Sequence, residues 1–272
     1  MKERITITLD NDLLNQIDGL VDERTIKNRS HAIELLINKG LNKKSITKAI
    51  LLAGGSEKIG LGKSKIPTCC GMINERTLLE HIIYSFKKYN INEFIVIARK
   101  SSIEIIKETL KNSRVADEII YLEEKEPMGT SGALNLASEY ITGPVVVCNT
   151  NSLFQIDLTE MFNFHKNTYS LATIALTTTS NTKNFGVVEL NGSKIFSFEE
   201  KPSKKKSSNL INAGCYIVEP EVIDLIPEGY SKFEIDLFPK LARQEQLAGF
   251  VFYGKWIRID NTEDLEDAEK EW

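Results

Sequence analysis

The chain has 272 residues, of which 42% are hydrophobic and 26% charged, and a formal net charge of −4. This composition excludes disordered and collagen-like chains, and no apolar run reaches the roughly 18 residues of a membrane span. The four cysteines lack Cys-x-x-Cys spacing, which argues against a disulfide framework and a zinc site and favours a reducing, cytoplasmic location.

A strand followed by two helices is predicted at the N-terminus. Apolar and polar residues alternate over residues 4–9, which is the period of a half-buried strand. Asp10 is predicted to cap a helix from Asn11 to about Asp22, and Ser30 a second helix that ends at Gly40. The polar face of the strand carries Arg4, Thr6 and Thr8.

A lone strand in so small a unit leaves a hydrogen-bonding edge unpaired, so a second copy is expected to pair with it. This pattern resembles the ribbon-helix-helix family of DNA-binding repressors over residues 3–41. The resemblance implies a homodimer or higher even oligomer that binds double-stranded DNA. The alternative is that residues 4–9 form an edge strand of the larger domain. The implied DNA-binding residues are Arg4, Thr6 and Thr8 at base edges, and Asn28, Arg29 and Ser30 at a phosphate.

The polar, basic residues 42–48 are predicted as a linker between a domain at 1–41 and a domain at 49–272. In the larger domain, apolar β-branched runs alternate with amphipathic helices, which indicates an α/β fold with a mixed, mostly parallel sheet. Loops that follow such strands should converge on one ligand site. The predicted strands are Ala49–Ala53, Glu93–Ala98, Glu118–Leu122, Pro144–Asn149, Leu171–Thr179, Phe185–Leu190, Lys194–Glu200, Ile211–Val218 and Gly249–Gly254, and the predicted helices are Leu78–Tyr89, Ile103–Lys111 and Gly132–Tyr140.

Eight motifs across residues 48–270 resemble, in order and spacing, the sugar-1-phosphate nucleotidyltransferases, also called nucleotide-sugar pyrophosphorylases. The resemblance implies a Rossmann-like nucleotidyltransferase fold. Enzymes of this family join a nucleoside triphosphate to a sugar 1-phosphate with loss of pyrophosphate, using fixed cations and Mg²⁺. The motifs are KAILLAGG, LLEHI, EPMGTSGAL, VVVCNTNSLF, FGVVEL, FEEKP, NAGCYIV and WIRIDNTEDLEDA.

The same resemblance implies four catalytic positions: an Arg after the Gly pair, a Lys after an Ile-Pro pair, and two metal-binding aspartates. In register, this chain has Lys58 or Ile59, then Thr68, Asn151 and Arg258 at those positions. Loss of one carboxylate beside a bound cation costs roughly 4 kcal/mol at an effective dielectric constant of 20. No catalytic residue, metal site or cofactor is therefore expected. Asp260 is the one candidate to restore a metal ligand, and Mg²⁺ is expected only if the chain is an active enzyme.

At the ligand-binding positions that the resemblance implies, this chain matches the family more closely than at the catalytic positions. The Gly-Gly pair and the GTSGAL loop match nucleotide-contacting segments, and later residues match the sugar-phosphate contacts. The alternative is that these residues serve only turns and solvated surfaces. The candidate ligand-binding residues are Gly54, Gly55, Gly129, Thr130, Ser131, Gly132, Gly186, Glu200, Lys201 and Asn212.

The sequence thus predicts a DNA-binding transcriptional regulator whose inactive nucleotidyltransferase-like domain, a pseudoenzyme, senses a nucleotide, a sugar phosphate or a nucleotide sugar. The alternative is an active sugar-1-phosphate nucleotidyltransferase with an N-terminal dimerisation or DNA-binding module. A third interpretation is a DNA-bound scaffold whose large domain binds a protein.

Overall fold

The computed structural model describes residues 6–21, 26–33, 36, 46–55, 58–61, 64–204 and 206–272. The chain divides into two compact units, Met1–Ser45 and Ile46–Trp272. None of the helices in the described part of the chain combines the length and apolar character needed to cross a membrane.

The first helix of the N-terminal unit, α1, spans Asn11–Asp18. The Asp10 side chain accepts a hydrogen bond from the backbone N–H of Leu13 at 2.8 Å, which confirms the predicted cap. Gly19 follows as the C-cap, so the helix ends earlier than the predicted limit at Asp22.

A second helical stretch covers residues 29–33. Its cap is Asn28, whose Oδ1 accepts the backbone N–H of His31 at 2.9 Å, so the predicted cap at Ser30 was wrong. Asn and Ser are both favourable N-cap residues. The helical stretch begins at Arg29, so the residue in the N-cap position is Asn28. The Arg29 Nε donates to Asp18 Oδ1 at 2.7 Å and ties this stretch to α1.

The predicted N-terminal strand is not formed over residues 6–9. Thr6, Ile7 and Thr8 are all exposed, so the expected alternation of buried and exposed faces is missing from the single chain. A strand needs a hydrogen-bonding neighbour, and the neighbour expected from the sequence was a second copy. Arg4 lies outside the described residues.

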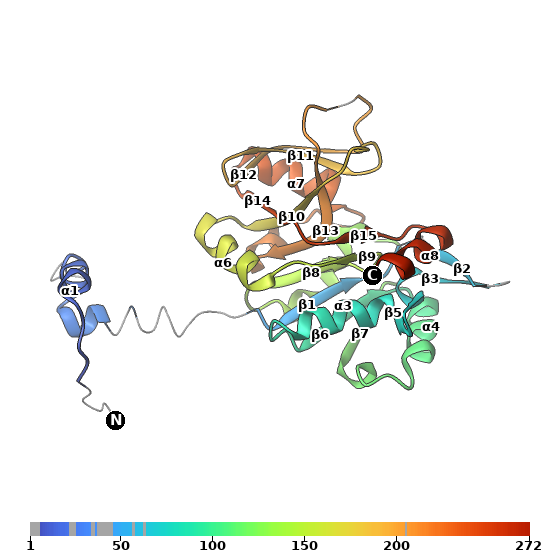
Figure 1. The fold of residues 1–272 in the computed structure, drawn as a ribbon, viewed down its shortest axis with the longest axis horizontal. Helices are drawn as coiled ribbons and strands as arrows, with labels where there is room; N and C mark the ends of the chain where they lie inside the picture. The colour runs from blue at the N-terminus through green and yellow to red at the C-terminus, as the bar shows by residue number, and fades with distance from the viewer. Residues whose placement is uncertain are drawn as a thin grey trace. The chain divides into compact units, whose positions relative to one another are not determined.

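The second unit is built on a nine-stranded sheet in the order β10-β14-β12-β11-β13-β8-β1-β6-β7 (Figure 1). Parallel pairing joins β8, β1, β6 and β7, and also β10 and β14. The other pairings are antiparallel, so the expectation of a mostly parallel sheet was wrong for the second half. The strands span Lys48–Leu52 (β1), Glu93–Ala98 (β6), Ile119–Glu123 (β7), Val145–Asn149 (β8), Ala172–Thr178 (β10), Gly186–Asn191 (β11), Lys194–Glu200 (β12), Leu210–Val218 (β13) and Leu247–Val251 (β14).

Successive side chains of the central strands pack into two separate hydrophobic cores. In β1, Leu51 belongs to one buried cluster and Ile50 to the other, because successive strand residues point to opposite faces. Helices α3, α4, α6 and α8 contribute to the first cluster, and α5 and α7 to the second. The helices span Leu78–Lys87 (α3), Lys100–Leu110 (α4), Gly129–Leu134 (α5), Leu158–Thr168 (α6), Phe238–Arg243 (α7) and Thr262–Glu271 (α8).

Short irregular helices fill the connections. The predicted helix at Gly132–Tyr140 is instead α5 followed by a 3₁₀ helix over Asn135–Tyr140. A π-helix, Phe233–Leu237, directly precedes α7. Further 3₁₀ helices lie at Thr68–Cys70, Ala116–Glu118 and Pro220–Leu225.

Three small antiparallel strand pairs were not predicted from the sequence. The pair β9 (Ser152–Phe154) and β15 (Trp256–Arg258) continues from the end of β8. The pairs β2 (Lys58–Leu61) with β3 (Ser64–Pro67) and β4 (Met72–Ile73) with β5 (Arg76–Thr77) lie before α3.

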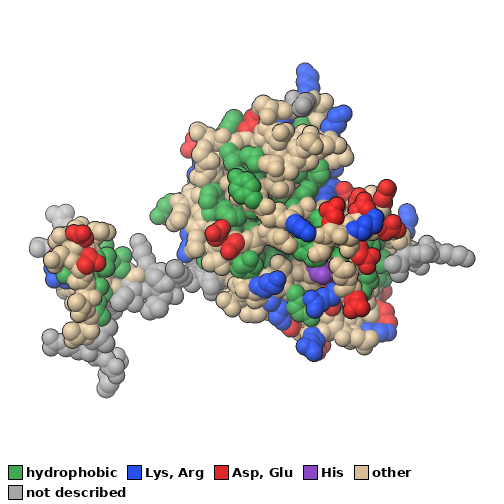
Figure 2. Space-filling view, in the orientation of Figure 1, with side chains coloured by type: hydrophobic (Ala, Val, Ile, Leu, Met, Phe, Trp, Pro, Cys, Tyr) green, Lys and Arg blue, Asp and Glu red, His purple; other side chains and the backbone are tan. Residues whose placement is uncertain are grey.

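Acidic side chains gather over α8 on the face shown in Figure 2.

The boundary between linker and domain also differs from the prediction. Lys48, placed in the linker, is the first residue of β1 and pairs with Glu93. Ile46 is buried with the first core cluster. The domain therefore begins before Ala49.

Candidate functional site

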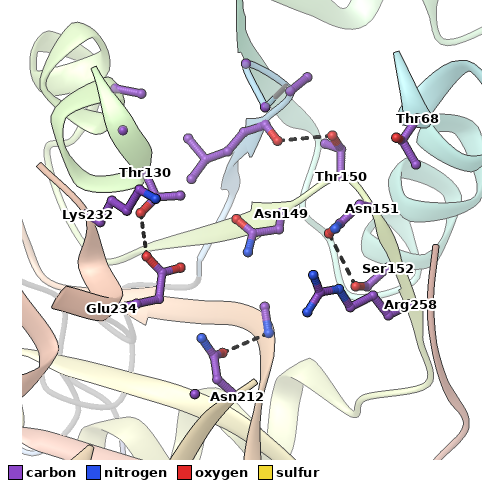
Figure 3. Close-up of a pocket in the computed structure, with 18 of the residues that line it drawn as sticks. Thr68, Thr130, Asn149, Thr150, Asn151, Ser152, Asn212, Lys232, Glu234 and Arg258 are labelled. Atoms are coloured by element: carbon purple, nitrogen blue, oxygen red, sulfur yellow. Dashed lines mark hydrogen bonds between the residues drawn. The ribbon is translucent and has the colours of Figure 1, made fainter. Parts of the chain in front are cut away.

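A cavity of about 480 Å³ opens where β1, β6 and β8 end (Figure 3). Its size falls within the roughly 300–1,000 Å³ of small-molecule sites. Ala53 follows β1, Arg99 follows β6 and Thr150 follows β8, and all three line it. The carboxyl ends of parallel strands meet at one edge of a sheet, which is why loops far apart in sequence converge here.

The structure brings most of the candidate ligand residues to this cavity, but Ser131 and Gly132 do not line it. The hydroxyl of Ser131 is buried against that of Ser231 at 2.8 Å, and the Gly132 N–H donates to the Ser231 carbonyl at 3.1 Å. These two residues hold the 229–231 segment. The candidates that line the cavity are Gly54, Gly55, Gly129, Thr130, Gly186, Glu200, Lys201 and Asn212.

Two of the loop glycines are required by the packing of the protein itself. Gly129 has φ +76°, and a Cβ there would lie 2.2 Å from the carbonyl oxygen of Ser231. A Cβ at Gly54 would lie 2.3 Å from the Glu124 Oε2. The absence of a side chain at Gly54 thus makes room for a carboxylate on the cavity wall.

Glu124 was missed by the sequence analysis, because it stands in the acidic run EEKE, which is typical of a solvated loop. The structure buries this side chain to 4% exposure. Its Oε1 accepts the backbone N–H of Met128 at 2.7 Å, which orients the carboxylate on the cavity wall.

Asn212 lines the cavity from β13. Its Nδ2 donates to the Tyr216 hydroxyl at 3.0 Å, and its Oδ1 accepts the Gly214 N–H at 2.9 Å. Tyr216 is fully buried, and burial holds the pKa of its hydroxyl well above the usual value. The amide of Asn212 is therefore held at the wall by two hydrogen bonds, of which Figure 3 shows the one from the Gly214 N–H.

Charged side chains of both signs line the cavity, with cations in slight excess. Burial, followed by the nearby Glu234, raises the pKa of Glu200, while Lys201, Arg258 and Lys232 oppose that rise. Arg99, Lys232 and Glu234 had not been singled out from the sequence; only Arg99, directly after a predicted strand, had a signal there. The lining cations are Arg99, Lys201, Lys232 and Arg258, and the lining carboxylates are Glu124, Glu200 and Glu234.

The antiparallel pairing of β9 with β15 brings together the two positions where the resemblance places metal-binding aspartates. Arg258 pairs with Ser152, and the Ile259 N–H donates to the Asn151 carbonyl at 2.8 Å. Thr68, the position of the expected Lys, also lines the cavity. Lys58 begins β2, and its side chain lies outside what the structure describes.

These groups do not suit a magnesium ion, which prefers carboxylate and water oxygens. The two positions hold an amide and a guanidinium. Asp260, the candidate replacement, accepts hydrogen bonds through Oδ1 from Arg258 Nε at 2.8 Å and from Asn151 Nδ2 at 3.3 Å. Across the described residues, no group of three or more His, Cys, Asp or Glu side chains is arranged to hold a metal. The donor set therefore disagrees with a divalent-cation site.

Comparison with known families and curated proteins gives a consistent result. Residues 48–272 match the family described as "Nucleotidyl transferase". A mannose-1-phosphate guanyltransferase of Yarrowia lipolytica is 31% identical over 226 residues, covering 80% of this chain and 62% of the relative. A probable mannose-1-phosphate guanylyltransferase 3 of Arabidopsis thaliana is 30% identical over 203 residues, covering 72% and 61% respectively. The chain thus spans about three fifths of these relatives' length.

Solved structures show the same fold. A putative glucose-1-phosphate thymidylyltransferase from Bacillus anthracis superposes with a TM-score of 0.73 at 21% identity, covering 82% of this chain and 94% of that one. HddC from Yersinia pseudotuberculosis, complexed with GMP-PN, gives a TM-score of 0.69 at 22% identity and covers 83% and 99%. The Rossmann-like nucleotidyltransferase fold expected for the large domain is confirmed.

These relatives overturn the function predicted from the sequence. That prediction, a DNA-binding transcription regulator with an inactive sensor domain, was wrong: relatives named as guanylyltransferases match up to 80% of the chain and favour an active enzyme. The pseudoenzyme was expected because residues differ at four catalytic positions. That expectation left aside the fold and the binding loops that the chain shares with the family. The family match begins at residue 48, so the ribbon-helix-helix similarity of residues 3–41 stays a prediction.

Proposed function

Because the chain belongs to the nucleotidyl transferase family, we propose that its α/β unit is a sugar-1-phosphate nucleotidyltransferase. In the proposed reaction, a phosphate oxygen of the sugar 1-phosphate attacks the α-phosphorus of a nucleoside triphosphate. The bond from that phosphorus to the bridging oxygen of the β-phosphate breaks, and pyrophosphate leaves. The products are a nucleotide sugar and pyrophosphate.

One observation carries the proposal: a single cavity holds both sets of residues that such a reaction needs. Gly54 and Gly129 contribute backbone to its lining, at the positions that match nucleotide-contacting segments. Asn212 and Lys201 line the same cavity, and their polar and cationic groups suit a sugar phosphate. The guanidinium of Arg258 extends from β15 past Ser152 and lies below Asn151 and above Asn212 in Figure 3.

The residues present account for binding and for stabilisation of charge. Two anionic substrates must meet at one phosphorus atom, so positive charge at the meeting point lowers their mutual repulsion. Arg258 and Lys201 supply that charge from two different strand ends. We assign no step to a metal, because the donor set does not fit one.

GTP and mannose 1-phosphate are the first substrate pair to test. The names of the two curated relatives support this choice. The buried carboxyl group of Glu124 supports it independently, because its oxygens can accept hydrogen bonds from a base. Guanine presents two donor groups side by side, N1–H and the N2 amino group, whereas the pairing edges of the other bases have no two adjacent donor groups.

The test is synthesis of a nucleotide sugar by the purified full-length chain. GTP, ATP, UTP, CTP and dTTP are each incubated with mannose 1-phosphate or glucose 1-phosphate, with Mg²⁺ and with EDTA, and both products are quantified. We expect equal amounts of pyrophosphate and nucleotide sugar, with GTP the best donor. Absence of a nucleotide sugar from every combination in both conditions would refute the proposal.

A further inference from the structure

The guanidinium of Arg258 is held by three contacts at the cavity wall. Its Nε donates to Asp260 Oδ1 at 2.8 Å, and its Nη1 donates to the Asn184 carbonyl at 3.2 Å. Its central carbon lies 5.1 Å from the centroid of the Phe185 ring. A group positioned in this way loses little conformational entropy when it binds a ligand.

The arrangement leaves one end of the guanidinium facing the cavity. The Nη2 of Arg258 makes no hydrogen bond to a described residue, and the side chain is 23% exposed. In Figure 3 the group lies below Asn151 and above Asn212, in the middle of the residues drawn. A planar guanidinium there can donate to two oxygens of one phosphate.

The charge at this place is as positive as in a metal-loaded site. Two aspartates and one divalent cation sum to zero formal charge. The amide of Asn151, the guanidinium of Arg258 and the carboxylate of Asp260, which accepts hydrogen bonds from both, also sum to zero formal charge. Substitution of both carboxylates therefore removes the metal ligands but preserves an attraction for phosphate.

We propose that Arg258 takes the place of the divalent cation, so that the diphosphate of a nucleotide sugar binds the guanidinium directly and without Mg²⁺. This inference rests on the proposed function for the identity of the ligand. Lys201 flanks the site and is 59% exposed, with its Nζ 4.0 Å from Glu200 Oε1. It is a second cation in the lining of the same cavity.

The first experiment measures binding of GDP-mannose to the full-length chain by isothermal titration calorimetry, in EDTA and in MgCl₂. We expect the two dissociation constants to agree within twofold. Arg258→Gln should weaken binding in EDTA at least tenfold. Arg243→Gln, an exposed change on α7 outside the cavity, should leave it unchanged and is the matched control.

The second experiment rebuilds the carboxylate pair. The double variant Asn151→Asp with Arg258→Asp, shown to be folded by circular dichroism, should bind GDP-mannose poorly in EDTA and at least tenfold better in MgCl₂. Inorganic pyrophosphate serves as a second probe and should compete with GDP-mannose for the wild-type protein in EDTA.

Three results would overturn the inference: tenfold weaker binding of wild-type protein in EDTA than in MgCl₂, an unchanged affinity of Arg258→Gln, or no binding of GDP-mannose in either buffer. The outcome is separable from that of the proposed function. Nucleotide-sugar synthesis together with any of these three binding results would uphold the function and refute this inference. Metal-free binding through Arg258 without any synthesis would do the reverse.

Discussion

The hydroxyl of Thr130 donates a hydrogen bond to Glu234 Oε2 at 2.8 Å, across 104 positions of sequence. The same hydroxyl oxygen accepts the backbone N–H of Phe233 at 3.0 Å. One side chain thus connects the first turn of α5 to the π-helix before α7. Since Gly129, beside it, lines the cavity, this connection positions one cavity wall.

Thr130→Val should loosen that connection. The variant keeps the shape of the side chain but leaves the Phe233 N–H and the Glu234 carboxylate without this partner, at a cost of about 1–3 kcal/mol in the free energy of unfolding. Urea unfolding followed by circular dichroism measures the change. Thr109→Val, on the exposed side of α4, is the matched control. Equal stability of the Thr130 variant and wild type would show that the connection is not important.

Glu200→Gln should stabilise the protein at neutral pH. Burial and Glu234 raise the pKa of Glu200, so the folded state favours the protonated form and ionisation at high pH weakens folding. The gain from the variant should be complete above the raised pKa and vanish as pH falls towards the ordinary value for Glu. Thermal melts from pH 4 to pH 8 measure it, with the exposed Glu221→Gln as control. A stability gain of Glu200→Gln that grows as the pH falls would contradict the predicted direction of the pH dependence.

Lys201→Gln should weaken use of the sugar phosphate. Removal of one cation from a phosphate contact is expected to raise the KM about tenfold, which corresponds to about 1.4 kcal/mol. Steady-state kinetics with varied mannose 1-phosphate measures it. Lys204→Gln, three residues on and outside the cavity, should leave the KM unaltered. Parallel losses in both variants would indicate a general effect of surface charge.

Glu124→Gln should relax the choice of base. A glutamine amide offers one donor and one acceptor, so the advantage of guanine over other bases should fall at least tenfold in kcat/KM. The comparison of GTP with UTP measures this ratio. Glu126→Gln, exposed in the same loop, is the control. An undiminished preference for GTP would remove Glu124 from base recognition.

Self-association of the N-terminal unit remains a prediction. Ile7, Leu13, Leu20 and Leu36 are between 40% and 49% exposed in the single chain. Analytical ultracentrifugation should find a dimer, and Leu13→Asp should shift it to monomer. The exposed Asn11→Asp change at the start of α1 is the control and should leave the protein dimeric. A monomeric wild-type chain at micromolar concentration would end the prediction.

The strands with the clearest apolar character were predictable from sequence. Glu93–Ala98 and Lys194–Glu200 were predicted with the bounds that the structure gives, because long β-branched or alternating runs leave little choice of structure. The three-residue strands β9 and β15 carry too short a pattern to be seen. Their pairing is decided by contacts between distant segments, such as Ile259 with Asn151.

Some residues of the candidate site were predictable from the sequence and others were not. Gly54 and Asn151 were found from the resemblance to the family, and the expectation that loops after parallel strands converge placed them at one site. Lys232 and Glu234 were missed, because their place depends on contacts with α5, about a hundred positions earlier. The functional prediction failed for another reason: residue substitutions were read as loss of activity, although a substitution can also change how charge is supplied.

The pairing of β9 with β15 has a consequence for synthesis of the protein. Asn151 and Asp260, which the pair brings into hydrogen-bonding contact, are separated by 109 positions. At about 5–20 residues per second, the ribosome needs roughly 5 to 20 s to travel from one to the other. The loops after β1 and β8 are made well before the guanidinium of Arg258. On the role proposed for Arg258, a nascent chain can begin to fold its sheet but cannot hold the phosphates of a ligand until β15 has emerged.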